Sequence, residues 1–542
     1  MRLNKIIQRD YTSFSLYYQI KLPLDLEISI PSDDPVRLVS AFVEEMDLSE
    51  LYKTYGRIRK NQATPRQMLK LVIYAAMNRI YSSRDIRKAC KRDINFMYLL
   101  EGMPAPDHAT IARFISLHFS ACAKVLLAQM SDLLYLLGEI SGKTIFIDGT
   151  KIESAANKYT FVWKRAITKN QARLYTKLTS FVAECEELYG IRTVYHDQIS
   201  IHTLKRLKKQ LCRVKVQEGI VFVHGIGRRK TQLQKSLEQL DQYLEKLKEY
   251  TKKLYTLGDR NSYSKTDPDT TFMRMKEDHM LNGQLKPAYN VQIAVENYFI
   301  VHSYVSSDRT DYNTLIPVLE KHRKAFGEDL EAVTADSGYC SEKNLSYLKE
   351  NGIKSYIKLQ DHEKRRTRAY KADIGKYYNM SCAVFEDEYY YICHDGRELR
   401  HMRTESRIQD GYTQTFEVYG CADCSGCEHK AKCLYKYDAE KHSDRNKVMK
   451  INERWEELKE ETNENIQSEE GILKRQTRSI QTEGHFGDIK ENENFRRFHY
   501  RSKEKVYKEF MLYAIGRNIM KYHRFLHHEI EKYEGKKEPK TA

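Results

Sequence analysis

The chain has 542 residues, of which 31% are charged and 41% hydrophobic, so it is long enough for several domains with at least one sizeable core. No uninterrupted apolar run is long enough to cross a bilayer, and the N-terminus has no apolar stretch of signal-peptide length, so we expect a cytoplasmic protein with no membrane partner. Lysine and arginine outnumber the acids by 91 to 75, a net charge of +16, which favours a polyanionic partner such as nucleic acid over an acidic small molecule.

The N-terminal region is predicted to be helical. In the stretch "TPRQMLKLVIYAAMNRIYSS", apolar residues recur at helical spacing, Thr64 can cap the helix and Pro65 takes its first position. Two further predicted helices, "SSRDIRKACKRD" and "DHATIARFISLHFSACAKVLLAQM", flank the break "EGMPAP". A helix, a break and a basic helix in this order are compatible with a helix-turn-helix that docks on DNA. Packed pairs of helices that do not bind DNA are, however, common.

After Gly142 the sequence changes to "KTIFIDGTKIES", a β-rich run that is predicted to form a strand ending at Asp148. Residues 157–280 are polar and predicted to be an inserted helical hairpin. Within them, "RKTQLQKSLEQLDQYLEKLKEYTKKL" is predicted to be a long amphipathic helix, because leucines recur every three or four positions. The basic outer face of such a helix is more often a solvated surface than a DNA contact.

Strand patterns return in "AYNVQIAVENYFIVHSYVSS", where Glu296 and Asn297 are expected to form a hairpin turn. A predicted helix follows, "DYNTLIPVLEKHRKAF", with Asp311 as its cap. Next come a strand leading to Asp336, a short helix, and the strand "KSYIKL". A last helix is predicted to begin near Thr482.

Without the helical insertion, this order of elements is that of a ribonuclease H-like domain. Three acids lie at the places where such a domain would bring them together. Asp148 ends the first strand, Asp336 follows the fourth, and Glu483 begins the closing helix. They can converge only if the sheet places the ends of its central strands side by side. Two or three converging carboxylates can hold a pair of Mg²⁺ or Mn²⁺ ions for phosphodiester chemistry. The alternatives are a turn at Asp148–Gly149 and a strand-to-helix cap at Asp336.

A second candidate metal site lies in a cysteine-rich segment. Six of the eleven cysteines fall between residues 382 and 433, and "CADCSGCEHKAKC" contains overlapping Cys-x-x-Cys pairs with the spacing of a tetrahedral zinc site. A metal-free loop and a redox function are the alternatives. The motif supplies Cys421, Cys424, Cys427 and Cys433, and Cys393 could provide the fourth thiolate if one of these is spare. The zinc hypothesis assigns the thiolates of Cys393, Cys424, Cys427 and Cys433.

The segments "FIDGTKIES", "TADSGYCSEKN" and "EGHFGDIK…FRRFHYRSKEKV" resemble the three signature segments of the DDE transposases of bacterial insertion sequences. The similarity covers most of residues 36–525 and is greatest to the group with an N-terminal helical domain and a Cys-containing segment before the last acid. The resemblance implies that Asp148, Asp336 and Glu483 are the catalytic, metal-binding triad.

The same resemblance assigns two DNA-binding cations. Lys490 matches the lysine seven positions after the glutamate in the family's Tyr-Arg-Glu-Lys signature. Ser479 stands at the arginine position, so Arg478 is its expected substitute, and the tyrosine has no evident occupant. Both cations would bind phosphates of the transposon end. Glu483, Gly487 and Lys490 share a helix face, so we expect Gly487 to leave that face open to a phosphate.

The resemblance also implies a domain organisation. It predicts an α/β catalytic core with a ribonuclease H-like mixed sheet, an all-α N-terminal domain that binds DNA ends, and inserted helical and Cys-rich segments. The N-terminal domain is assigned to residues 1–140 and the helical insertion to 157–280. The Cys-containing insertion is assigned to 361–464, a polar tail to 526–542, and the catalytic core to 141–156, 281–360 and 465–525.

The function implied is transposition. Such a protein binds the terminal inverted repeats of its element as a homodimer in a synaptic complex, cleaves the ends, joins them to target DNA, and is associated with the nucleoid. A non-catalytic transposase-like DNA-binding protein and a structure-specific nuclease on the same fold are the alternatives. The three acids argue against the first of these, because a protein that only binds DNA has no use for them.

Overall fold

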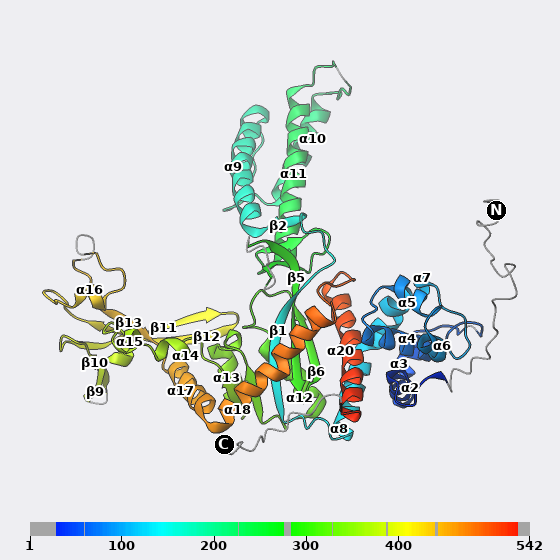
Figure 1. Ribbon diagram of the computed structural model, residues 1–542. Helices are drawn as coiled ribbons and strands as arrows, with labels where there is room; N and C mark the ends of the chain where they lie inside the picture. The colour runs from blue at the N-terminus through cyan, green and yellow to red at the C-terminus, as the bar shows by residue number, and fades with distance from the viewer. Residues whose placement is uncertain are drawn as a thin grey trace, which may run out of the picture. The chain divides into compact units, whose positions relative to one another are not determined.

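The computed structural model describes residues 29–58, 60–225, 227–275, 283–327, 329–385, 388–438 and 443–528; the side chains of 385, 388 and 483 lie outside this description. The chain divides into two compact units (Figure 1). One comprises Met1–Met130 with Met511–Lys532, and the other comprises Ser131–Phe510 with Tyr533–Ala542. Most of the predicted polar tail, residues 529–542, lies outside the described residues.

The first unit is all helical in its described part. Its central helix α4 (Pro65–Met77) is buried along nearly its whole length and starts with the expected cap, since the Thr64 hydroxyl accepts from the Gln67 amide at 3.2 Å. Gly516 lies close to α4, because an added Cβ would stand 3.2 Å from the Ile73 carbonyl oxygen. The other helices of this unit are α2 (Pro35–Glu45), α3 (Ser49–Lys53), α5 (Ser83–Ala89), α6 (Ile94–Leu100) and α7 (His108–Arg113), with the second half of α20 (Lys503–Leu526).

Helix α7 continues without a break through η3 (Phe114–Phe119), a π-helical segment, into α8 (Ser120–Leu136). Within the described residues, this helix of His108–Leu136 is long and apolar enough to cross a membrane by length and composition alone, contrary to our expectation. Half of its most apolar window is buried inside the structure, and core helices of soluble proteins pass the same test. It is therefore weak evidence for a membrane span.

The second unit contains a mixed sheet in the order β4-β5-β1-β7-β8, with β6 also paired to β5. β1 is antiparallel to β5 and parallel to β7, which is parallel to β8. β5 and β6 are joined by a two-residue turn at Asn297 and Tyr298, both with positive φ, one residue later than predicted. The strands are β1 (Thr144–Glu153), β4 (Thr271–Arg274), β5 (Leu285–Glu296), β6 (Phe299–Ser306), β7 (Ala332–Ala335) and β8 (Lys354–Ile357).

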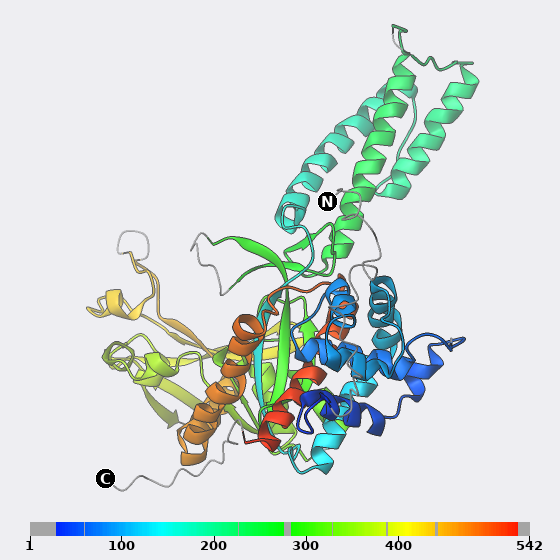
Figure 2. The same ribbon diagram turned by 45° about the vertical axis from the view of Figure 1, so that its right-hand side comes forward.

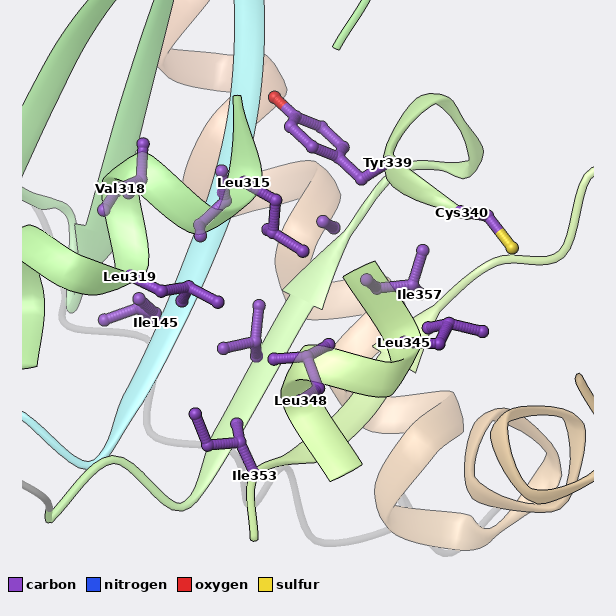
Figure 3. Packing of buried hydrophobic residues seen from close by; sticks show 14 of the residues in the cluster. Ile145, Leu315, Val318, Leu319, Tyr339, Cys340, Leu345, Leu348, Ile353 and Ile357 are labelled. Carbon is purple, nitrogen blue, oxygen red and sulfur yellow. The ribbon is translucent and has the colours of Figure 1, made fainter. Parts of the chain in front are cut away.

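An apolar core fills the space between this sheet and α12 (Leu315–Phe326) and α13 (Glu342–Glu350). Figure 3 shows Ile145 of β1 and Ile357 of β8 packed with leucines of both helices, while the Tyr339 hydroxyl points away from these aliphatic side chains. The core also includes Leu458 of α17 (Glu453–Gln467). The mixed α/β character of this unit agrees with the prediction.

Three predicted boundaries in the second unit are wrong. β1 does not end at Asp148 but continues to Glu153, because its second half pairs with β5. Asp311 does not cap α12, since Thr314 holds that position. The last helix before α20 does not begin near Thr482: α18 starts at Glu469 and runs on through η6 (Ser479–Glu483), α19 (Gly484–Gly487) and η7 (Asp488–Asn492).

In its described residues, the helical insertion contains three helices rather than the predicted hairpin. α9 (Lys164–Tyr189), α10 (Ile201–Gln217) and α11 (Gln232–Leu257) run alongside one another (Figure 2). Their leucines form a separate core, and α11 confirms the predicted long amphipathic helix. At the base, β2 (Phe161–Trp163) pairs with β3 (Ser262–Ser264).

The Cys-containing segment forms a five-stranded antiparallel sheet in the order β13-β12-β11-β10-β9. A small core that includes Leu399, Tyr419 and Cys424 lies against it. Its strands are β9 (Ser381–Phe385), β10 (Glu388–Ile392), β11 (Glu398–Gln409), β12 (Tyr412–Cys421) and β13 (Val448–Ile451).

Candidate active site

Asp148 and Asp336 lie at the same place on two neighbouring strands. In the parallel β1–β7 pair, Ile147 is opposite Ala335, and each is followed directly by one of the acids. Asp148 is nearly buried, and its Oδ1 accepts from the Gly149 amide at 2.7 Å. Asp336 is exposed, and its carboxylate accepts from the Ser337 amide at 2.7 Å, so it does cap the short helix η4 (Ser337–Tyr339). The tertiary structure thus brings the two acids to neighbouring positions on adjacent strands, although they are far apart in the sequence.

Arg478 is held against Asp148. Its Nη1 lies 3.4 Å from Asp148 Oδ2, and the side chains are only 16% and 13% exposed. The Thr482 hydroxyl also lies 3.3 Å from Asp148 Oδ2, and it donates to the Arg478 carbonyl oxygen at 2.9 Å. The junction of α18 (Glu469–Arg478) with the π-helical segment η6 therefore packs over the end of the Asp148 side chain.

Glu483 follows Thr482 directly in η6, but its side chain lies outside the described residues. Lys490 lies in η7 with its side chain buried at 6% exposure, so it is not a solvated surface cation. An added Cβ at Gly487 would meet no atom within 4 Å, so this position faces open space. Glu483 and Lys490 thus lie within the two π-helical segments, and such segments in α-helices are frequent at functional sites.

A polar network beside the two acids was missed in the sequence. Asp311 Oδ1 accepts from Asn290 Nδ2 at 2.7 Å and from Gln292 Nε2 at 2.9 Å. Tyr339 donates to Gln292 Oε1. Burial, followed by the carboxylates of Asp311, Asp148 and Asp336, raises the pKa of Tyr339 well above its ordinary value, so its hydroxyl remains a donor. The available signal was two buried polar residues, Asn290 and Gln292, at alternate positions of an apolar strand.

Gly149 is explained by this network rather than by a turn. It lies within β1 directly opposite Gln292 of β5. An added Cβ would stand 2.3 Å from Gln292 Nε2 and 2.8 Å from its Oε1. The turn alternative at Asp148–Gly149 is therefore wrong, and the glycine allows a buried amide to lie directly against the backbone beside Asp148.

Three of the four cysteines of the zinc hypothesis interact electrostatically with the fourth, Cys433. Burial raises the pKa of Cys433, and the Lys447 ammonium lowers it. The thiols of Cys393, Cys424 and Cys427 raise this pKa further, so these three thiols lie within electrostatic range of Cys433. The Lys447 amide donates to Cys424 Sγ at 3.3 Å. Nevertheless, no group of three His, Cys, Asp or Glu side chains in the described part of the chain is arranged to hold a metal ion, either here or at the carboxylates.

Two parts of the chain match known protein families. Residues 392–523 match the family described as Transposase DDE domain, and residues 24–117 match Transposase domain (DUF772). The first match includes Arg478, Glu483 and Lys490, whereas neither includes Asp148 or Asp336. No curated protein and no solved structure matches the chain.

A DDE domain defines an enzyme that acts on nucleic acid. Both matches together indicate an insertion-sequence DDE transposase, a family that binds DNA at transposon ends and generally uses divalent metal ions.

Proposed function

We propose that this chain cleaves phosphodiester bonds at the ends of its insertion sequence and joins the ends to target DNA, with Asp148, Asp336 and Glu483 as its catalytic carboxylates. The proposal rests mainly on one observation: Ile147 and Ala335 are opposite each other in the parallel strands β1 and β7, and Asp148 and Asp336 directly follow them. The contact of Thr482 with Asp148 supports the third acid, because Glu483 is the next residue.

A ribonuclease H-like core is part of this proposal. Taken in chain order, β1, β5 and β6 are antiparallel neighbours, and β7 and β8 extend the sheet on the other side of β1 in parallel. With the helical insertion left out, the observed order of strands and helices agrees with the order predicted from the sequence, on which the expectation of a ribonuclease H-like domain is based. Asp148 lies in the central strand β1 and Asp336 directly follows its neighbour β7, which supports a site built on rigid strands.

The donor chemistry of these carboxylates fits Mg²⁺ or Mn²⁺, which prefer oxygen ligands and need few of them from protein. Asp148, Asp336 and Glu483 would hold the ions. When bound, two such ions activate the attacking oxygen and stabilise the leaving oxygen of a phosphodiester.

The remaining residues of the site orient the substrate. Arg478 lies against Asp148, so it would bind a phosphate of the transposon end beside the carboxylates, a ligand that a guanidinium can hold bidentately. Lys490 is proposed as a second phosphate ligand. The Gln292 network keeps the backbone around Asp148 in one geometry, which preorganises the site.

For the whole protein we propose binding to terminal inverted repeats and target DNA as a homodimer in a synaptic complex, at the nucleoid in the cytoplasm. The net charge of +16 supports a polyanionic partner. The N-terminal domain, residues 1–140, is the proposed end-binding module.

A structural zinc ion held by Cys393, Cys424, Cys427 and Cys433 is a separate proposal. It is supported by the electrostatic interaction of the other three thiols with Cys433 and by the backbone N–H bond to Cys424 Sγ. Because the described thiols are not arranged to hold a metal ion, the zinc would require their side chains to move together.

The test of the catalytic proposal uses Asp148→Asn, Asp336→Asn and Glu483→Gln with labelled transposon-end DNA and Mg²⁺. Each should abolish end cleavage while DNA binding persists. Glu331→Gln is the matched control, because this exposed acid precedes β7 at its other end and pairs with Lys143. Full cleavage by any triad variant would refute the assignment.

The same assay separates the alternatives. Cleavage without joining to a target duplex would indicate a nuclease on the same fold. Binding of the ends by the unmodified protein without cleavage would indicate a non-catalytic DNA-binding protein.

A further inference from the structure

Helix α10 differs from its two neighbours in charge. Its 17 residues include six lysines and arginines and no acid. α9 and α11 each carry five basic residues, but these are offset by three acids in α9 and four in α11. The positive charge of the insertion is therefore concentrated on one helix.

Three of these cations form a row along the exposed face. Lys205, Lys209 and Arg213 are four residues apart, so successive Cα atoms lie about 6 Å apart along the helix axis. The opposite face of α10 is buried in the core of the insertion through Leu204, Leu207 and Leu211. The row thus points away from the helices that hold α10 in place.

The charges of this row are not neutralised by any residue in the described part of the chain. Among the described residues, Lys205, Lys209 and Arg213 are in no ion pair. By contrast, Lys208 pairs with Asp241 of α11 at 2.5 Å, and the Lys215 ammonium lies 4.0 Å from the ring centre of Phe222. An open hollow of about 670 Å³ runs along the helix, and all three side chains of the row line it. A row of free cations beside a hollow suits an extended polyanion.

We propose that the α10 row is a second DNA-binding surface, which binds the phosphate backbone of duplex DNA independently of sequence. Evenly spaced cations can each neutralise one phosphate, whereas reading bases requires side chains inserted into a groove. The identification of the polyanion as DNA rests on the proposed function. Flanking or target DNA, which has no fixed sequence, is the partner that such a surface fits.

The test measures binding of a labelled random-sequence duplex by the full chain over a series of salt concentrations. Each phosphate contact contributes about 0.9 to the slope of log affinity against log salt. The triple variant Lys205→Gln, Lys209→Gln, Arg213→Gln should therefore reduce the slope by about 2.7. Single variants should each reduce it by about 0.9, which keeps the proposal testable if the triple variant does not fold.

The matched control is Lys246→Gln, Lys248→Gln, Lys252→Gln, which removes the same charge from exposed positions of α11. It should leave the slope unchanged. An equal loss in both triple variants would show an effect of net charge alone, and no loss in the α10 variants would show that the row does not bind DNA. Either result would overturn the proposal. Competition by polyglutamate or single-stranded RNA that equals competition by duplex DNA would also overturn it.

The outcome is separable from that of the catalytic proposal. If Asp148→Asn abolishes cleavage but the α10 variants bind normally, only the second surface is refuted. If the α10 variants lose binding as expected but Asp148→Asn cleaves fully, only the catalytic assignment is refuted.

Discussion

The contact between Gly149 and Gln292 leads to a quantitative prediction for Gly149→Ala. The added Cβ would stand 2.3 Å from Gln292 Nε2, too close for any heavy-atom contact, so the amide must move. Gln292 is fully buried and has little room to do so. The backbone of Gly149 is not in the left-handed region, so the cost comes from the displaced amide rather than from backbone strain.

The magnitude follows from the hydrogen bonds that the displaced amide would lose. Its Nε2 donates to Asn290 Oδ1 at 3.0 Å and to the Asp311 carboxylate at 2.9 Å, and its Oε1 accepts from Tyr339. A net hydrogen bond is worth about 1 kcal/mol and one to a charged group about 1.5–3 kcal/mol. We expect Gly149→Ala to destabilise the unit by about 3 kcal/mol, which for a unit of this size is a fall in Tm of about 4 °C.

A double-mutant cycle with Gln292→Ala tests this reasoning by thermal unfolding. Once the amide is gone, Gly149→Ala has nothing to displace, so its additional cost should fall below about 1 kcal/mol. Gly484→Ala, whose Cβ would meet no atom within 4 Å, is the control for adding a methyl group. If Gly149→Ala lowers Tm equally with and without Gln292, the contact is not the cause and the reasoning is wrong.

Three further predictions concern the closing helix, pH and zinc. Gly487→Leu fills open space beside the proposed site, so it should block end cleavage without lowering Tm; a soluble, fully active variant would contradict this. Burial lowers the pKa of the His302 imidazole to about 3, against about 6.5 in the unfolded chain. The stability that this difference contributes is fully present above pH 6.5. It is lost as the pH falls further, because acid protonates His302 in the unfolded chain first. At pH 5 the loss should be about 2 kcal/mol, and His302→Gln should abolish this part of the pH dependence of Tm; parallel curves would exclude His302 as its source. Elemental analysis should find one zinc per chain, lost in Cys433→Ser but not in Cys212→Ser, and metal-free protein would exclude the zinc site.

The local elements follow directly from the sequence where one periodicity dominates. The Thr64 cap and the apolar spacing after it predict α4, and the leucine repeat predicts α11, because each pattern is formed by neighbours along the chain. The predicted end of β1 failed because it depends on a distant partner. β1 continues past Asp148 because β5 pairs with it, and no residue near Asp148 carries that information.

The sequence by itself determined the identity of the candidate acids and their order along the chain, since an acid directly after a short apolar β-rich run is visible locally. Only the tertiary structure decided which groups surround them. Arg478 reaches Asp148 from 330 residues away, and Gln292 is placed opposite Gly149 by strand register. These contacts depend on sheet pairing and helix packing between remote segments, and a single sequence contains no measure of such distances.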